Sequence, residues 1–388
     1  MNEWVAGNRI ALLTTGDEYF PALEADIDAA REEIHLETYL FENDPTGQRI
    51  AECLARAARR GVAVRVLVDG FGAANLVPPL RQILESAQVS ILVFRPERER
   101  FRFKRNRLRR MHRKLVVIDH RIGFCGGINI HDDRDGRGEG QPRFDFAVRV
   151  EGPIVADMHA AVWRLWKLVE WTQVGRRVGP RMERCAPQPS YPEGLRAAFL
   201  VRDNLRNRRT IEDAYLEAIE GAQRDILIAN AYFLPGRRFR RALRSAAQRG
   251  VKVRLLLQGK REYFWVHYVT RALHGRLLSA GMEVHDYTVA WLHAKVAVVD
   301  GHWATVGSSN IDPLSLLMAR EANVVVEDRT FAVALQSKIE AAMVEGGELI
   351  QAESLARRPW LDRLLSWMAI GIARIASGLI GTSRLEGR

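Results

Sequence analysis

Two copies of one short pattern, His-x-Lys-x4-Asp, lie 181 positions apart in this chain of 388 residues. The histidines are His112 and His293, and each is followed 17 positions later by an asparagine, Asn129 or Asn310, at the end of a glycine-containing turn. A histidine can attack phosphorus or carry a proton, and a lysine can bind phosphate oxygens. Two such pairs in one pocket could therefore transfer a phosphoryl group without a metal, and the asparagine amides could hydrogen-bond the same group.

Alternation of side chains along a strand divides each motif into two parts. The residues after the first lysine are apolar and mostly β-branched, which predicts a strand with His112 and Lys114 on one face and Asp119 on the other. The second copy alternates in the same way, through His293, Lys295 and Asp300. We expect each histidine and lysine to meet the ligand and each aspartate to hold the following turn; contact with the ligand is the alternative for the aspartates.

A catalytic imidazole needs a carboxylate behind it to fix its tautomer. Glu321 lies just before an apolar strand of the second half, and Asp145 holds the corresponding place in the first half, after an inserted polar loop at 131–141. We predict that both orient a histidine, with an ordinary charge at a strand edge as the alternative for Asp145. Ser308 in the second turn could hydrogen-bond phosphate and its counterpart Gly127 could not, so the two half-sites should differ.

The matching registers of the two motifs predict one site on a pseudo-two-fold axis, at the interface of the duplicated halves. The motifs supply lysine rather than a cluster of carboxylates, and a cationic site repels Mg²⁺ and Zn²⁺. The chain has no P-loop and no dinucleotide fingerprint. We therefore expect the site to use neither a metal nor a cofactor.

The duplication extends well beyond the motif and predicts the fold class. Helical stretches rich in alanine and arginine, at 50–60 and 239–249, each end at a glycine and lead into a strand. The predicted strands are 61–69, 91–94 and 148–151 in the first half and 250–258, 282–287 and 324–327 in the second. Alternating strands and helices indicate an α/β protein of two duplicated domains, each a mixed β-sheet flanked by helices.

A stretch rich in proline and glycine sets the domain boundaries. The predicted organisation is a first domain at 1–175, a linker at 176–195, a second domain at 196–350 and a C-terminal segment at 351–388. The cysteines are Cys53, Cys125 and Cys185, too dispersed for a disulfide framework or a zinc site, which favours a reducing compartment; the first two should be core residues. Neither a signal peptide nor an apolar run of membrane-spanning length is evident.

The doubled motif, with its Gly-Gly/Ser-x-Asn turn, resembles the phospholipase D superfamily. Further stretches resemble the bacterial cardiolipin synthases, and among them the B type, which lacks N-terminal membrane helices: Gly7–Leu13, Leu36–Tyr39, Arg110–Lys114, Ala229–Phe233 and Ala304–Asp312. The likeness runs from about Gly7 to Glu340 and matches both His-Lys-Asp sets position by position. It implies that a phosphatidyl group moves from phosphatidylglycerol to a histidine, with loss of glycerol, and then to a second phosphatidylglycerol, giving cardiolipin. The sequence does not decide which histidine is the nucleophile; of the two assignments we take His112 as the nucleophile and His293 as the acid.

Two segments could bring such a site to a lipid. Ten Lys or Arg residues alternate with apolar ones at 98–114, which suits an anionic bilayer; a solvated loop or a nucleic-acid contact are the alternatives. The segment 359–381 reads as a helix with a narrow polar stripe, typical of a helix that lies in the membrane interface; packing on the core or on a dimer partner is the alternative. These features predict a peripheral protein on the cytoplasmic side of a bacterial membrane.

The formal charge of +11 favours a polyanionic partner, either nucleic acid or an anionic membrane, with a solvated basic surface as the alternative. The leading hypothesis is phosphatidyl transfer to form cardiolipin on an anionic membrane surface. The competing hypotheses are lipid hydrolysis of the phospholipase D type, a phosphodiesterase that acts on nucleic acid, and a scaffold without catalysis. The amphipathic C-terminal segment favours lipid over nucleic acid, and two intact motifs disfavour the scaffold.

Overall fold

The computed structural model describes residues 3–73, 76, 78–96, 109–134, 140–174, 189–203, 207–260, 273–312, 319–351 and 353. The predictions for Cys185, for the linker up to residue 188, for the basic segment before residue 109 and for the C-terminal helix lie outside these residues. Among the residues that are described, no helix has the length and apolar character needed to cross a bilayer.

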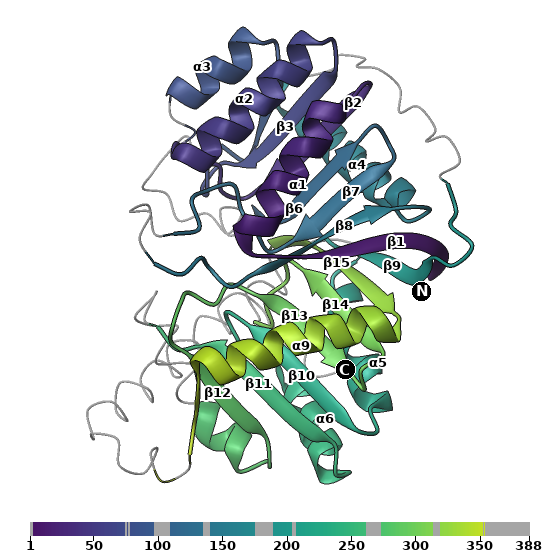
Figure 1. Cartoon of the computed structure of the whole chain (residues 1–388), viewed down its shortest axis with the longest axis vertical. Helices are drawn as coiled ribbons and strands as arrows, with labels where there is room; N and C mark the ends of the chain where they lie inside the picture. Colours follow the sequence, from purple (N-terminus) through teal and green to yellow (C-terminus); the bar gives the residue numbers. More distant parts are fainter. Residues whose placement is uncertain are drawn as a thin grey trace.

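Two halves of similar build follow one another along the chain (Figure 1). The first contains β1 (Val5–Thr14), α1 (Thr15–Ala29), β2 (Glu33–Thr38), α2 (Pro45–Arg59), β3 (Ala63–Asp69), α3 (Pro78–Ser86), β4 (Ser90–Phe94), β5 (Arg110–Met111), β6 (Lys114–Ile118), β7 (Ile122–Gly126), β8 (Phe146–Glu151) and α4 (Val155–Val174). The second contains β9 (Leu195–Arg202), α5 (Thr210–Gly221), β10 (Asp225–Asn230), α6 (Arg237–Gln248), β11 (Lys252–Gln258), β12 (Glu283–Tyr287), β13 (Lys295–Val299), β14 (Trp303–Gly307), β15 (Ala319–Glu327), α9 (Arg329–Gly346) and β16 (Gly347–Leu349).

Local sequence explains where the helices begin and which face they bury. Helix α2 starts at Pro45, where the missing N–H of proline costs nothing because the first N–H groups of a helix have no partner within it. The side chain of Asp44 caps the helix by accepting a hydrogen bond from the N–H of Gly47. Its buried residues include Ile50, Leu54 and Ala57, which recur at helical spacing, so one face of α2 packs on the sheet.

One continuous sheet joins the halves, in the order β16-β12-β11-β10-β13-β14-β15-β9-β1-β8-β7-β6-β2-β3-β4, with β5 attached to β15. In each half three parallel strands (β2, β3 and β4; β10, β11 and β12) adjoin an antiparallel set (β6, β7 and β8; β13, β14 and β15). The halves meet where β1 pairs with β9. The predicted α/β fold with two duplicated mixed sheets is confirmed.

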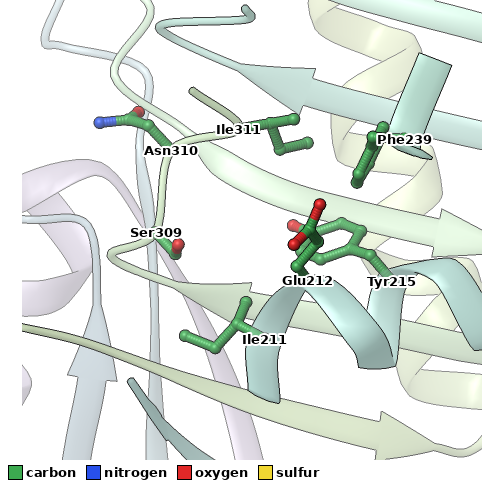
Figure 2. Close-up of a pocket in the computed structure, with 7 residues that line it drawn as sticks. All are labelled: Ile211, Glu212, Tyr215, Phe239, Ser309, Asn310 and Ile311. Atoms are coloured by element: carbon green, nitrogen blue, oxygen red, sulfur yellow. The ribbon is translucent and has the colours of Figure 1, made fainter. Parts of the chain in front are cut away.

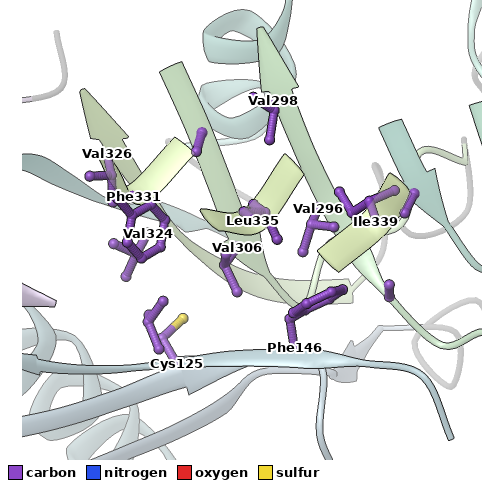
Figure 3. Packing of buried hydrophobic residues seen from close by; sticks show 14 of the residues in the cluster. Cys125, Phe146, Val296, Val298, Val306, Val324, Val326, Phe331, Leu335 and Ile339 are labelled. Carbon is purple, nitrogen blue, oxygen red and sulfur yellow. The ribbon is translucent and has the colours of Figure 1, made fainter. Parts of the chain in front are cut away.

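The hydrophobic core has separate outer parts and a shared centre. Helices α1 to α3 cover one face of the first sheet, and α5 and α6 cover a face of the second (Figure 1). Between the halves, Cys125 and Phe146 pack with Val306, Val324 and Leu335 of the second half (Figure 3). This shared core fixes the relative position of the two halves and therefore of the two motifs. Cys53 and Cys125 are buried and free, as predicted.

Candidate functional site

Short backbone pairings between the halves place each motif histidine against the opposite half. Strand β5, just before His112, pairs in parallel with the start of β15, and the N–H of His112 donates to the carbonyl of Arg320 at 2.9 Å. In the second motif the N–H of His293 donates to the carbonyl of Phe144 at 2.9 Å. In both cases the acceptor is the residue immediately before the predicted carboxylate, so the backbone alone brings each histidine to the carboxylate of the other half.

The two histidine–carboxylate pairs are exchanged between the halves. His112 Nδ1 lies 3.2 Å from Glu321 Oε2, and His293 Nδ1 lies 2.6 Å from Asp145 Oδ2. Because Nδ1 of each imidazole is held by a carboxylate, Nε2 is the nitrogen that remains for a substrate. The side chains of His112 and His293 keep 17% and 13% of their surface exposed, so neither ring is fully enclosed.

The two carboxylates differ in proton affinity. Burial alone would raise the pKa of Glu321, but the neighbouring His112 and Lys114 and a hydrogen bond from Ser308 hold it below its usual value. Burial raises the pKa of Asp145 to about 6, although Lys295 opposes the shift. Burial, followed by the motif lysines, lowers the pKa of His112 and takes that of His293 well below its usual value. Both imidazoles are therefore neutral at pH 7, Glu321 is firmly ionised, and Asp145 can accept a proton.

The motif lysines lie beside their own histidines. Lys114 Nζ donates to the carbonyl of His112 at 2.8 Å, and Lys295 Nζ donates to the carbonyl of His293 and lies 3.8 Å from Asp145 Oδ2. Both side chains are buried. Burial lowers the pKa of Lys114 to about 7, and the charge of Lys295 contributes to this, so the two ammonium groups share one electrostatic site.

The motif aspartates point away from this site, as strand alternation predicts. The carboxylate of Asp119 accepts the backbone N–H groups of Arg31, Glu32 and Glu33, which open strand β2. Asp300 does the same for the residues that open β10, namely Gln223, Arg224 and Asp225. Both aspartates have positive φ angles, 49° and 53°, at the turn after the motif strand. Both carboxylates are thus hydrogen-bonded to the backbone that precedes the neighbouring strand, next to the turn after the motif.

The structure places Ser308 beside one of the two carboxylates. Its hydroxyl donates to Glu321 Oε2 at 2.5 Å, accepts from the N–H of Ala322 at 3.1 Å, and is fully buried. The single hydroxyl proton is therefore used on Glu321, and contact of Ser308 with phosphate stays a prediction. In the first half a side chain at Gly127 would collide with Asp145, whose carboxylate oxygens lie 2.3 and 2.5 Å from the position of an added Cβ.

The motif asparagines are both buried, in different settings. Asn129 Oδ1 accepts from the N–H of Leu40 at 3.3 Å, whereas Asn310 Oδ1 has no hydrogen-bond partner among the described residues. Asn310 belongs to a small pocket, where Ser309, Asn310 and Ile311 follow one another on one side and α5 contributes the other (Figure 2). The buried hydroxyls of Tyr215 and Ser309 also lack partners in the described structure, so this pocket presents unsatisfied polar atoms beside the second motif.

Sequence reasoning missed three groups around the site. The ring of Tyr39 lies 4.9 Å from that of His112 and 5.3 Å from Lys114 Nζ. Arg113 forms a buried ion pair with Glu37 at 2.8 Å, behind the motif. Both Glu37 and Tyr39 lie in a stretch that carried the family resemblance, and their counterparts in the second half are alanines. Alignment of the two repeats therefore contains a signal that could have identified them.

Arg202 is the third missed residue, and no motif marks it. It stands directly opposite Glu321 across strands β9 and β15 and is fully buried. None of its guanidinium nitrogens has a hydrogen-bond partner among the residues described. Burial lowers its pKa to about 10, and the charge of Glu321 opposes that shift, so Arg202 remains a cation at neutral pH.

Comparison with known proteins gives concordant results. The sequence profile of the family described as cardiolipin synthase, PLD-like domain, matches residues 23–166 and 215–343. Cardiolipin synthase B of Salmonella typhi is 38% identical over 388 residues, covering 97% of this chain and 91% of the relative. Cardiolipin synthase B of Escherichia coli strain K12 is 38% identical over 378 residues, with the same coverage. The structure of phosphatidylserine synthase from Haemophilus influenzae Rd KW20 matches with a TM-score of 0.74 at 14% identity, covering 97% of this chain and 96% of that one, which shows a shared fold.

Proposed function

The chain belongs to the cardiolipin synthase family of phospholipase D-like proteins, and we propose that it transfers a phosphatidyl group from one phosphatidylglycerol to the hydroxyl of another. The products are cardiolipin and glycerol. The observation that carries the proposal is the pair of histidines, each held at Nδ1 by a carboxylate of the opposite half, with two buried lysines beside them. This arrangement supplies a nucleophile, a proton carrier and cations for a phosphodiester, all within one site.

In the first step His112 Nε2 attacks the phosphorus of phosphatidylglycerol, and the bond from phosphorus to the glycerol oxygen breaks. The proton for that oxygen comes from the His293–Asp145 pair: with a proton held on Asp145, His293 Nε2 gives its proton to the glycerol oxygen while Nδ1 takes the proton from Asp145, so glycerol leaves as a neutral alcohol. Lys114 and Lys295 would bind the non-bridging oxygens, whose negative charge shifts during attack. Asn129 and Asn310 stand at the ends of the two turns and are the further candidates for contact with the phosphate.

In the second step the hydroxyl of another phosphatidylglycerol gives its proton to His293 Nε2, and Nδ1 returns its proton to Asp145. Its oxygen attacks phosphorus, and the bond from phosphorus to His112 Nε2 breaks. Cardiolipin is released and both histidines return to their starting protonation states. The same histidine thus serves as acid and then as base, because the second step is the reverse of the first with a different alcohol.

The unequal carboxylates support this division of labour. A phosphorylated imidazole carries positive charge, which an ionised partner stabilises, and Glu321 is held in its ionised form by His112, Lys114 and Ser308. A proton carrier benefits from a partner near its own proton affinity, and Asp145, with its pKa raised to about 6, meets His293 in a short 2.6 Å contact. We therefore assign His112 as the nucleophile and His293 as the acid and base.

The substrate is a phospholipid, so the site must meet a membrane surface. We propose a peripheral protein on the cytoplasmic face of a bacterial membrane, where the chain's net charge of +11 favours anionic lipid. The segments 98–114 and 359–381 are the candidates for this contact on the basis of their sequences. Removal of residues 359–388 should move the protein from the vesicle pellet to the supernatant, and unchanged sedimentation would count against a role for that segment.

The test of the function is direct. Purified protein is incubated with vesicles of phosphatidylglycerol, and lipids and soluble products are analysed by mass spectrometry. Cardiolipin with an equal amount of glycerol supports the proposal. Phosphatidic acid without cardiolipin would show a hydrolase, and nuclease activity without lipid turnover would replace the proposal altogether. His112→Ala and His293→Ala should each abolish turnover of phosphatidylglycerol.

A further inference from the structure

A second group of imidazoles lies at the opposite end of β6 from the catalytic lysine. Glu33 opens strand β2, His120 stands in the turn after β6, and His159 lies in α4. Glu33 Oε1 is 2.8 Å from His159 Nε2 and 3.4 Å from His120 Nε2, and all three ligand atoms fall within 4.8 Å of one another. The length of β6 separates this cluster from Lys114 by about 15–20 Å, at about 3.3 Å per residue.

We propose that Glu33, His120 and His159 bind one Zn²⁺ ion, with water in the fourth position. Zinc takes imidazole nitrogen and carboxylate oxygen at about 2.0–2.2 Å in tetrahedral geometry, which puts neighbouring ligand atoms about 3.3–3.6 Å apart. The 3.4 Å separation of Glu33 Oε1 from His120 Nε2 falls in that range, and the 2.8 Å separation from His159 Nε2 requires a small outward shift on binding. Two imidazoles with one carboxylate also suit zinc better than Mg²⁺ or Ca²⁺, which prefer sites made of oxygen.

The surroundings of Glu33 orient its two oxygens differently. Oε2 accepts a hydrogen bond from Arg65 Nη1 at 2.9 Å and lies 3.3 Å from His35 Nε2. The guanidinium of Arg65 in turn lies 4.8 Å from the centre of the Trp163 ring. These contacts fix Glu33 Oε2 and leave Oε1 facing His120 and His159. Hydrogen-bond partners behind a metal ligand commonly orient it in this way.

The second half of the chain shows that the fold does not need these imidazoles. At the places that correspond in the aligned repeats to Glu33, His35 and His120, the second half has Asp225, Leu227 and Gly301. It has Leu335 where His159 stands, eight residues after the matching strand end. The same strands, turn and helix therefore form without a histidine, which leaves the cluster of the first half in need of another explanation.

The backbone at His120 supports the same conclusion. His120 has φ of 56° and follows Asp119 with φ of 49°, in a turn closed by the N–H of Arg121 and the carbonyl of Ile118 at 3.0 Å. Two successive positive φ angles favour Asp-Gly, which is what the second half has at Asp300 and Gly301. His120 therefore occupies a position where glycine would be free of strain. In the same turn, Asp119 Oδ1 accepts a hydrogen bond from the N–H of Glu33.

The site would clamp three elements, β2, the β6–β7 turn and α4. It is separate from the phosphoryl-transfer site, where we expect no metal. A set of hydrogen bonds between the imidazoles and Glu33, with no ion, is the competing explanation, and the two differ in what Zn²⁺ does to the protein.

The test uses the full chain without a polyhistidine tag, freed of metal with a chelator and dialysed. Zn²⁺ is then titrated while bound metal is measured by mass spectrometry and by competition with a coloured chelator, and the melting temperature is followed in parallel. We expect one ion for each chain and a rise in melting temperature. Absence of stoichiometric binding would overturn the proposal in favour of the hydrogen-bonded cluster.

His120→Gly is the decisive variant because it installs the residue that the second half uses and relieves the positive φ. It should fold, and its melting temperature without metal should equal or exceed that of the wild type, but its Zn²⁺ affinity should fall at least tenfold. His285→Ala is the matched control, since His285 lies 2.7 Å from Glu283 but belongs to no group of three metal-ligand side chains among the described residues, and it should bind Zn²⁺ as the wild type does. Equal binding by His120→Gly and the wild type would place the ion elsewhere and refute the assignment.

Discussion

Replacement of Glu321 by glutamine tests both the exchange of carboxylates between halves and the assignment of the nucleophile. The substitution keeps the shape of the side chain and removes its charge, while His112 Nδ1 remains 3.2 Å from an oxygen or nitrogen. At that distance an ionised carboxylate stabilises a positive imidazole by about 5 kcal/mol, with an effective dielectric constant of about 20. We therefore expect formation of the phosphatidyl-enzyme to slow by roughly 10³- to 10⁴-fold.

The assay separates the two chemical steps by the choice of leaving group. With phosphatidylglycerol the first step needs an acid, whereas a phosphatidyl ester of p-nitrophenol needs none, because p-nitrophenolate leaves unprotonated. The activated ester should restore the first step in Asp145→Asn and in His293→Ala, but not in Glu321→Gln. In His293→Ala the covalent adduct on His112 should accumulate, visible as an increase in intact protein mass, since no base remains for the second step.

Two outcomes would refute this reasoning. If the activated ester rescues Glu321→Gln and not Asp145→Asn, the nucleophile and the acid are exchanged. If neither variant loses more activity than Glu283→Gln does, the carboxylates do not act on the histidines at all. Glu283 is a fair control because it accepts a hydrogen bond from His285 at 2.7 Å in β12 and plays no part in the proposed chemistry.

Three further predictions concern charge and stability. Arg113→Ala should lower the unfolding free energy in urea by about 3–5 kcal/mol, because Glu37 is left buried without its partner, and adding Glu37→Ala should recover much of the loss, since the second half has alanine at both places. In the wild type kcat/KM should fall above about pH 7, because Lys114, with its pKa lowered to about 7 by burial, loses its charge, and Lys114→Arg should move that limb to higher pH. Asp300→Asn should destabilise the protein at neutral pH, and the gap to the wild type should close as pH falls: although burial opposes it, three backbone N–H groups lower the pKa of Asp300 in the folded state, so its stabilisation is present above the unfolded pKa and is lost as pH falls through the folded one.

The fold and the motif residues were accessible from sequence because they rest on local patterns. Periodicity predicted the strands of each half, and alternation within the motif strand separated Lys114 from Asp119 before any contact was known. The duplication strengthened the prediction of the site, because packing of a single strand does not explain a motif that recurs in the same register in both halves. What the motif residues contact, however, was only partly predictable.

The parts that sequence could not supply depend on contacts between distant segments. The exchange of carboxylates follows from a two-residue strand, β5, that pairs with β15 of the other half, and two residues are too few to leave a periodic signal. Sequence also does not predict the contact of Ser308 with Glu321, because a serine near a phosphate site has two possible partners. Arg202 carries no local signal at all, since its position opposite Glu321 is a matter of register across strands.

The asymmetry of the site follows from the reaction. A symmetric pair of half-sites would give each histidine the same tendency to attack and to carry protons, yet one turnover needs one nucleophile and one acid. The sequence differences fall where they separate these tasks: a longer carboxylate fixed by Ser308 on one side, and a shorter one filling the space beside Gly127 on the other. The ring of Tyr39 lies close to His112, while alanine stands in the matching place near His293. The differences in carboxylate length and support alter the proton affinity of the carboxylates, while the matching backbone hydrogen bonds of His112 and His293 are retained, so divergence of the halves could divide the roles without disturbing the shared geometry.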